Sequence, residues 1–173
     1  ALEKAHDRII SPKYLTAGMG DGGGCHPRDN IVLSHLAKTN NLSCDMPGMM
    51  MKARELQTEW IANHAIKHSL KSGLPLAVLG RAFKPETNIE TGSPAVLCIN
   101  LLKEKGFEVL NYEPFNDEKP IEEPCVFIIG CKHQIFKDMK FPTGSIVIDP
   151  HRYVEPQSGV VIHKLGANRE SIS

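Results

Sequence analysis

The sequence predicts an α/β protein in which a helical connector is followed by a Rossmann-like domain with a parallel sheet and helices on both faces. From residue 74 onward, short apolar runs alternate with segments of helical periodicity, which is typical of a parallel sheet with crossover helices. The run over residues 125–130 shows little polar alternation, as expected of a strand covered on both faces. Before residue 74 the sequence shows only helix and loop patterns, which form the connector.

The connector is expected to contain two helices. Asp29 or Asn30 can cap the first, because either side chain can accept hydrogen bonds from the free amides of a first turn. Pro47 suits the first turn of the second helix, and Gly73 ends it. The predicted segments are the end of a helix over residues 1–10, a loop over 11–29, a helix over about 31–39 and a helix over about 47–71.

The apolar residues of the second connector helix allow two interpretations. The single Trp and four of the six Met lie in or beside this helix. Packing into the core of the same chain explains such a face simply. If the face is exposed, it indicates a contact between subunits instead.

The sheet region is expected to begin with a strand over residues 76–79. Ser93 and Pro94 then start a helix as cap and first-turn residue, and Gly106 ends it. The remaining strands are predicted over residues 107–112, 125–130, 146–149 and 160–163.

Three side chains follow strand ends, where α/β sheets bind ligands. Phe83 and Lys84 come after the first strand, and Arg152 comes after the strand over 146–149. Two cations at this edge indicate an anionic ligand, since Arg suits bidentate phosphate contacts; an ordinary exposed lysine is the alternative for Lys84. A single glycine, Gly80, follows the first strand, so the region lacks the GxGxxG cradle of dinucleotide-binding domains.

Composition excludes several classes of function. The 173 residues carry 20 basic and 20 acidic side chains, mixed along the chain. Neither a nucleic-acid partner nor a membrane surface is therefore expected. The five cysteines lack zinc-type spacing, so a reducing cytoplasm is predicted. No metal site is expected, because the one helical pair of histidines, His64 and His68, is interpreted as decoration of a solvent-facing side.

The run over residues 18–29 is the most informative segment. Five glycines within seven residues lead to Cys25, and Asp29 follows four positions later. Glycine lets a ligand approach the main chain closely, so the run indicates a cysteine nucleophile beside a pocket built from backbone. The alternatives are a flexible turn and a small buried thiol.

Several motifs, in order, resemble the UDP-glucose/GDP-mannose dehydrogenase family. Residues 20–29 resemble its GxGGxCxPxD signature, and residues 79–85 resemble its LGxAFKP segment. Further matches are Lys13-Tyr14-Leu15, Ser93-Pro94-Ala95, Asn111-Tyr112-Glu113-Pro114 and Asp149-Pro150-His151-Arg152-Tyr153. The likeness spans nearly the whole chain.

The resemblance implies an NAD-dependent nucleotide-sugar 6-dehydrogenase. Such an enzyme oxidises the C6 alcohol of a UDP- or GDP-sugar to a carboxylate in two hydride transfers. The chain is expected to be a fragment without the N-terminal NAD-binding domain, inactive alone, and part of a homodimer. The implied divisions are 1–29, the end of the central region with the catalytic and substrate loop; 30–73, the helical dimerisation region; and 74–173, the nucleotide-sugar-binding domain.

The resemblance also implies roles for individual residues. Cys25 matches the nucleophile that forms a thiohemiacetal and then a thioester, and Asp29 matches an aspartate that handles water or a proton. Arg152 matches an arginine that reaches the NAD phosphates. The residues that match substrate contacts are Tyr14, Leu15, Gly22, Phe83, Lys84 and, reaching the sugar site of a partner subunit, Arg8.

Two positions depart from the family pattern. Thr91 and Gly92 stand where the family carries an arginine, which contacts the cofactor, and a glutamate. A degenerate family member is therefore an open alternative. So is a module that binds nucleotide sugars and dimerises without catalysis, with Cys25 a spectator, and so is a purely structural domain.

Overall fold

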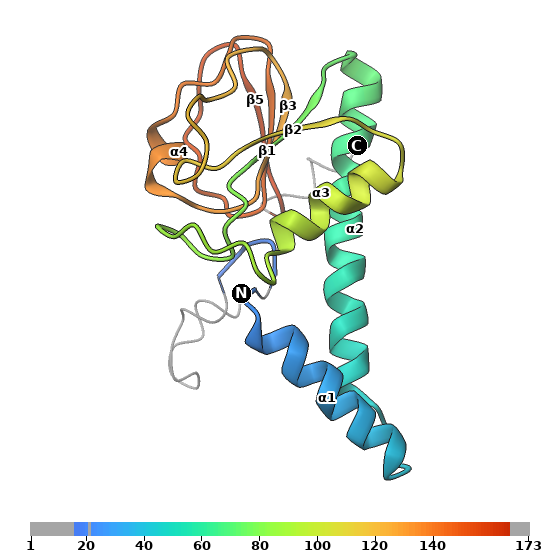
Figure 1. Ribbon diagram of the computed structural model, residues 1–173. Helices are drawn as coiled ribbons and strands as arrows, with labels where there is room; N and C mark the ends of the chain where they lie inside the picture. The colour runs from blue at the N-terminus through green and yellow to red at the C-terminus, as the bar shows by residue number, and fades with distance from the viewer. Residues whose placement is uncertain (1–15, 21, 167–173) are drawn as a thin grey trace, which may run out of the picture.

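The computed structural model describes residues 16–20 and 22–166. A sheet domain stands at one end of a long helix, and a second helix lies along the other end of it (Figure 1). The helix expected over residues 1–10 lies outside the described residues. The elements are α1 (Cys25–Thr39), α2 (Met46–Ser72), β1 (Leu76–Leu79), α3 (Pro94–Glu104), β2 (Val109–Tyr112), β3 (Val126–Ile129), α4 (Gln134–Asp138), β4 (Ile146–Asp149) and β5 (Val161–Lys164).

The sheet has five parallel strands in the order β2-β1-β3-β4-β5. This is the flavodoxin-like order of doubly wound folds, in which the chain direction across the sheet reverses between β1 and β3. The ends of these two strands therefore open a crevice at the carboxyl edge. The predicted fold class is confirmed.

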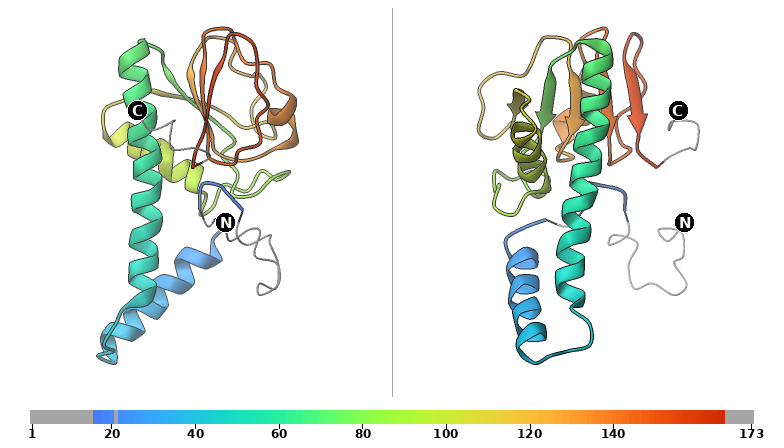
Figure 2. Two further views of the ribbon diagram at one scale, coloured as in Figure 1. Left: turned by 180° about the vertical axis from the view of Figure 1, so that it is seen from behind. Right: turned by 90° about the vertical axis from the view of Figure 1, so that its right-hand side faces the viewer.

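Two hydrophobic layers cover the two faces of the sheet. Residues of β1 alternate between them: Leu76 and Val78 pack with α2 and α3, whereas Ala77 and Leu79 pack on the opposite side. That second side is covered by α4, through the buried Phe136, and by connecting loops. Figure 2 shows α2 running past one face of the sheet and continuing beyond it, where α1 lies at its side.

Capping residues set both ends of helix α2. Asp45 caps it by accepting the Gly48 amide at 2.9 Å, and the same carboxylate accepts the Ser34 hydroxyl of α1 at 2.6 Å. Gly73 ends it in the left-handed conformation, with φ of 74°. The predicted helix over 47–71 is thus confirmed to within one residue at each end, and Ser34 ties α1 to the start of α2.

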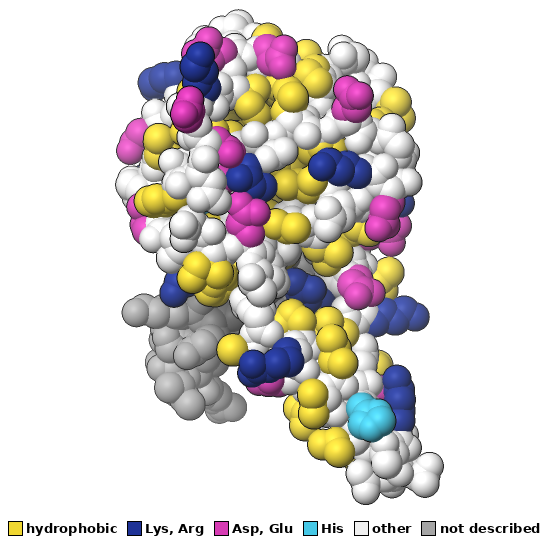
Figure 3. Space-filling view, viewed as in Figure 1, with side chains coloured by type: hydrophobic (Ala, Val, Ile, Leu, Met, Phe, Trp, Pro, Cys, Tyr) yellow, Lys and Arg dark blue, Asp and Glu magenta, His cyan; other side chains and the backbone are white. Residues whose placement is uncertain are grey.

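The apolar residues of α2 divide between core and surface. Ile61, Ala62 and Ala65, in its second half, are buried against the sheet and α3. The first half and the adjacent α1 expose large apolar side chains, which are visible over α1 in Figure 3. They include Ile31, Val32, Leu33, Leu36, Met46, Met49, Met50, Leu56 and Trp60. The core interpretation therefore holds for the buried residues of the second half, and the first half has the exposed face on which the subunit-contact interpretation depends.

Three local expectations are wrong. Helix α1 begins at Cys25, inside the expected loop, and neither Asp29 nor Asn30 caps it; the cap position is Gly24, without a side-chain bond. The apolar period starts only at Ile31, so nothing in the pattern marks the first turns. Helix α4 was not expected, because five residues are too few to show a period.

The expectation that His64 and His68 decorate a solvent-facing side of the helix is also wrong. Both rings are partly buried and lie against His163 of β5 rather than facing solvent. In the described part of the chain, no helix combines the length and apolar character that a membrane crossing requires.

Candidate functional site

A pocket of about 900 Å³ opens at the carboxyl ends of β1, β3, β4 and β5. The glycine run closes one side of it, and the middle of α2 contributes Gln57, Trp60 and Ile61. The other lining residues are Thr16, Ala17, Gly18, Met19, Gly20, Gly22, His26, Phe83, Lys84, Pro85, Pro94, Gly130, Cys131, Lys132, Pro150, His151, Arg152, Leu165 and Gly166. The pocket therefore lies where doubly wound sheets bind ligands.

Among the described residues, the charged side chains that line this pocket are all basic. Lys84, Lys132 and Arg152 line it, and no carboxylate does so among the described residues. A cleft with cations on its walls concentrates anions and holds phosphate oxygens well. The structure thus brings Gly22, Phe83, Lys84 and Arg152 together around one anion-attracting cavity.

Phe83 joins the glycine run to the sheet edge. A Cβ atom at Gly22 would lie 3.2 Å from the Phe83 carbonyl oxygen, and one at Gly23 would lie 3.1 Å from the Phe83 ring. The Lys84 ammonium lies 5.4 Å from the centre of the same ring, within the range of a cation–π contact. Glycines are needed here because the backbone lies directly on an aromatic side chain.

A backbone contact closes the glycine run on its other side. The Gly23 amide donates to the Gly92 carbonyl oxygen at 3.2 Å, and Arg54 of α2 donates to that oxygen at 3.1 Å. Gly92 has a φ of 71°, and a Cβ atom there would overlap the Gly23 carbonyl group. Gly92, which departs from the family pattern, is therefore the residue that lets the loop before α3 touch the glycine run.

Buried polar groups hold the loop after β1. One Glu113 oxygen accepts the Arg81 and Ala82 amides at 2.7 and 2.9 Å, and the other lies 3.1 Å from Nε2 of His133. Nδ1 of His133 accepts the Glu86 amide at 3.0 Å. Both side chains are buried, so Lys84 stands on a loop that is tied down before and after it.

The loop after β4 is organised by Asp149. Its buried carboxylate accepts four backbone amides, those of residues 151–154, at 2.7 to 3.0 Å. Arg152 adopts a φ of 60°, and its Nε donates to the Leu165 carbonyl oxygen at 2.6 Å. Burial lowers the pKa of neighbouring His151, so that ring lines the pocket as a neutral group at pH 7.

Cys25 and Asp29 do not line the pocket but stand beside it, next to the lining residue His26. Cys25 is the exposed first residue of α1, and Asp29 lies one helical turn later on the same face. Arg28 Nε donates to Asp29 at 2.8 Å. The pKa of Arg28 is raised by this hydrogen bond and the charge of Asp29, and further by Cys25, so the guanidinium lies near both groups.

Three of the other four cysteines are buried, unlike Cys25. Burial raises the pKa of the Cys98, Cys125 and Cys131 thiols, to about 12, 11 and 12 respectively. Cys44 is exposed like Cys25, but it lies beyond the end of α1, away from the pocket.

Three predicted residues lie outside the described part of the chain, and two residues that were not predicted line the pocket. Arg8, Tyr14 and Leu15 lie outside the described residues. The structure adds Lys132 and His151 to the pocket wall. Lys132 could have been predicted from the sequence, because it follows β3, which borders the point where the strand order reverses. The inward position of His151 could not, because it depends on the turn that Asp149 organises.

A flavodoxin-like sheet with a cationic pocket at its carboxyl edge defines an α/β protein of the doubly wound class, in which the ligand crevice lies at the strand ends. The profile of the "UDP-glucose/GDP-mannose dehydrogenase family, central domain" matches residues 3–57. Together with the relatives below, this match confirms that the chain belongs to the UDP-glucose/GDP-mannose dehydrogenase family.

Two curated relatives agree with this assignment, and a solved structure shares the fold. UDP-glucose 6-dehydrogenase TuaD of Bacillus subtilis is 34% identical over 62% of the chain and 24% of its own length. UDP-glucose 6-dehydrogenase 4 of Oryza sativa subsp. japonica is 31% identical over 94% of the chain and 36% of its own length. The structure of UDP-D-ManNAc dehydrogenase from Pyrococcus horikoshii superposes with a TM-score of 0.76 at 22% identity, over 95% of this chain and 42% of that one. The chain thus spans about a quarter to a third of the length of these curated relatives.

Proposed function

We propose that this chain supplies the nucleotide-sugar-binding part of an NAD-dependent 6-dehydrogenase that oxidises a sugar C6 alcohol to a carboxylate. The observation that carries the proposal is the pocket at the sheet edge, with three cations and no described carboxylate in its wall. A UDP- or GDP-sugar bears a diphosphate that fits this charge. The names of the family relatives support a sugar of this kind.

The proposed binding roles follow the placement of the lining residues. Lys84 and Lys132 provide charge for the diphosphate, Phe83 provides an apolar surface, and Gly22 lets the ligand approach the main chain. Tyr14, Leu15 and Arg8 are proposed as further substrate contacts on the resemblance alone.

Cys25 is the proposed nucleophile. Its thiolate forms a bond to the C6 aldehyde carbon, and loss of hydride from the resulting thiohemiacetal leaves a thioester. Water then attacks the thioester carbon, which releases the carboxylate and restores the thiol. Asp29, on the same face of α1, is placed to orient that water or take its proton, and a helix N-terminus with a nearby guanidinium is a setting that activates a cysteine.

Two NAD⁺ molecules, bound one after the other, would each accept one of the two hydrides of this reaction. Of the described residues, Arg152 fits a cofactor phosphate, because its guanidinium lies at the pocket wall on a loop held by Asp149. The segment after β1 has no second or third glycine of a dinucleotide cradle. We therefore expect no turnover by this chain without a separate NAD-binding domain.

The proposed assembly is a homodimer in the cytoplasm. The exposed apolar side chains of α1 and the first half of α2 are numerous for a monomer surface, which supports 30–73 as the dimerisation region beside a loop region, 1–29, and a nucleotide-sugar-binding domain, 74–173. All five cysteines are free, as is usual in a reducing compartment.

A second candidate function is a binding and dimerisation module without catalysis. It is favoured by Thr91 and Gly92, which replace the arginine and glutamate of the family pattern. In this case the pocket binds the nucleotide sugar, but Cys25 has no special reactivity.

Alkylation of the two exposed thiols distinguishes these functions, since Cys44 is a matched control on the same chain. We expect iodoacetamide to modify Cys25 at least about tenfold faster than Cys44 near neutral pH, and UDP-glucose to protect Cys25 only. Equal rates contradict the nucleophile but not the pocket, whereas absence of UDP- and GDP-sugar binding by calorimetry at millimolar concentration contradicts both functions. With an NAD-binding domain co-expressed, a Cys25→Ser variant as active as the parent would refute the covalent route.

A further inference from the structure

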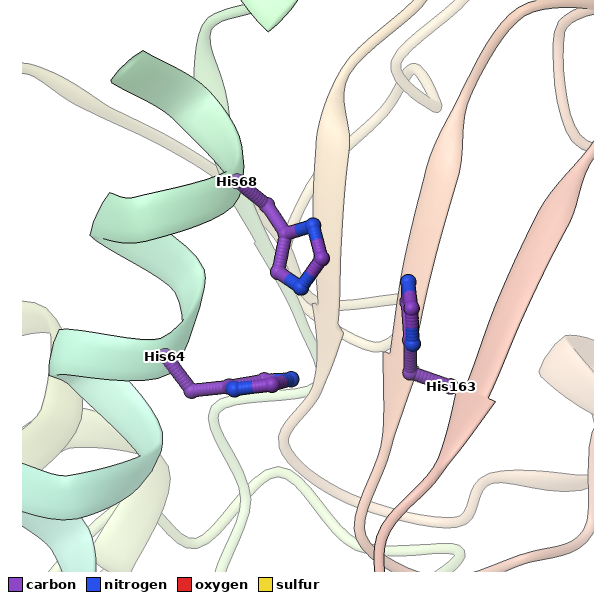
Figure 4. A group of neighbouring side chains, drawn as sticks. All are labelled: His64, His68 and His163. Atoms are coloured by element: carbon purple, nitrogen blue, oxygen red, sulfur yellow. The ribbon is translucent and has the colours of Figure 1, made fainter. Parts of the chain in front are cut away.

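Three histidines converge beside Trp60, a residue of the pocket wall on which the His64 ring stacks. His64 and His68 lie one turn apart on α2, and His163 projects toward them from β5 (Figure 4). The ring centres of His64 and His68 are 4.8 Å apart, those of His68 and His163 are 4.4 Å apart, and those of His64 and His163 are 5.8 Å apart. One nitrogen from each ring lies within 4.8 Å of the others.

We propose that these three imidazoles form a binding site for a divalent transition metal ion, of which Zn²⁺ fits best. Three histidines with a fourth position open to water are a recognised zinc ligand set. No carboxylate or thiol belongs to the group, so Mg²⁺ and Ca²⁺, which require oxygen ligands, are poor candidates.

One ring nitrogen of the group lacks a partner. Nε2 of His64 is buried, and no hydrogen bond to it is found among the described residues. A buried polar atom without a partner is unfavourable, and a metal ion would satisfy it. The His64 ring stacks on Trp60, with ring centres 5.8 Å apart and planes at 15°, which holds the ring in place.

The protonation state of the cluster suits a metal. Burial lowers the pKa of all three histidines, that of His68 to about 4, and the charged forms of the neighbouring histidines lower the pKa of His64 and His68 further. The charged neighbours that act on them are Lys67 and Lys71 of α2, which lower the pKa further. Neutral imidazole is the form that ligates metal, so little proton release opposes binding at pH 7.

The backbone supports the required geometry. Around a tetrahedral Zn²⁺ with bonds of about 2.0–2.1 Å, ligand nitrogens lie about 3.3–3.4 Å apart, so modest side-chain rotations bring the rings into place. Helical spacing places His64 and His68 on one side of α2, and His163 is held in register with Ile148 of β4.

A bound ion would fasten the edge strand β5 to α2. This connection is relevant to the pocket, because Trp60 and Leu165 both line it, and Leu165 follows His163 by two residues. The metal is thus expected to be structural, holding one wall of the pocket, rather than to act on the substrate.

Co²⁺ binding to the full 173-residue chain tests the proposal. We expect visible absorption of the four-coordinate type without a thiolate charge-transfer band, and quenching of the single Trp, which stacks on His64. Added Zn²⁺ should reverse both signals. His163→Ala and, separately, His68→Ala should weaken binding by at least about tenfold, while His35→Ala, at an exposed histidine of α1, should leave it unchanged.

Three results would overturn the proposal. The first is unchanged affinity in a folded His163→Ala variant, which would mean that the pair on α2 binds metal by itself. The second is a thiolate band, which would place the ion on Cys25 or Cys44. The third is no quenching of Trp60 at millimolar Co²⁺. Circular dichroism of each variant establishes that it is folded, and His163→Gln replaces His163→Ala if the latter is not.

Discussion

Substitution of Gly92 by alanine tests whether the loop before α3 positions the glycine run. The new methyl group meets backbone atoms of Gly23 and lies 3.0 Å from the Gly24 amide nitrogen, and backbone cannot rotate away as a side chain can. A left-handed φ adds about 1–2 kcal/mol for a residue with a Cβ atom, and overpacking adds about 1–3 kcal/mol. We therefore expect a loss of about 2–5 kcal/mol in the free energy of unfolding.

Gly73→Ala is the matched control. Gly73 has a φ of 74°, close to the 71° of Gly92, but a Cβ atom there has nothing within 4 Å. The control thus carries the backbone strain and the same change in the unfolded chain, without the overlap. The difference between the two variants, about 1–3 kcal/mol, measures the overlap alone.

Thermal unfolding followed by circular dichroism gives the stability, and alkylation gives the local effect. For a chain of this size 1 kcal/mol shifts Tm by about 2–4 °C, so Gly92→Ala should unfold roughly 2–12 °C below Gly73→Ala. Alkylation of Cys25, two residues beyond Gly23, should change in rate, while that of Cys44 should not. Equal Tm values for the two variants, together with an unchanged rate of Cys25 alkylation, would contradict the positioning role of Gly92.

Three further predictions concern the sheet edge and the histidine cluster. Asp149→Ala should lower the free energy of unfolding by about 3–5 kcal/mol, measured by urea titration, because four amides lose a buried charged acceptor. Lys84→Ala should weaken UDP-glucose binding by at least about tenfold in calorimetry, since an exposed cation is removed from the pocket wall. In metal-free protein, stability should fall as the pH drops from about 6.5 toward 4, because the folded pKa of His68 is about 4 and the unfolded chain takes up the proton first.

Each of these predictions has a control. Asp138→Ala, at an exposed residue of α4, should change stability by less than about 0.5 kcal/mol, and an equal effect of both substitutions contradicts the anchor role of Asp149. Lys119→Ala, also exposed, should not affect binding, and a loss equal to that of Lys84→Ala indicates a diffuse charge effect. His68→Gln should flatten the pH dependence of stability. An unchanged slope would assign that pH dependence to other titratable groups.

Elements whose signals are local can be predicted from the amino-acid sequence alone. Strand β1 is a short apolar run, α2 has Pro47 in its first turn and ends at Gly73, and α3 starts after Ser93, which caps it as expected by accepting the Ala95 amide at 3.1 Å. Such signals depend on residues a few positions apart, which is why they can be read along the chain. The alternation of strands and helices then identified the parallel sheet, and with it the edge where Phe83, Lys84 and Arg152 lie.

Contacts between residues far apart in the sequence become visible only in the folded chain. Glu113 joins His133, Gly92 touches Gly23, and His163 reaches α2, because strand order and helix packing bring these segments together and no local period records that order. Which half of α2 is exposed cannot be predicted from the sequence either. An apolar face with helical spacing has the same pattern whether it packs on its own sheet or on another molecule. The sequence pattern also does not predict that α1 begins at Cys25, because the first turns of this helix carry no apolar residues at helical spacing.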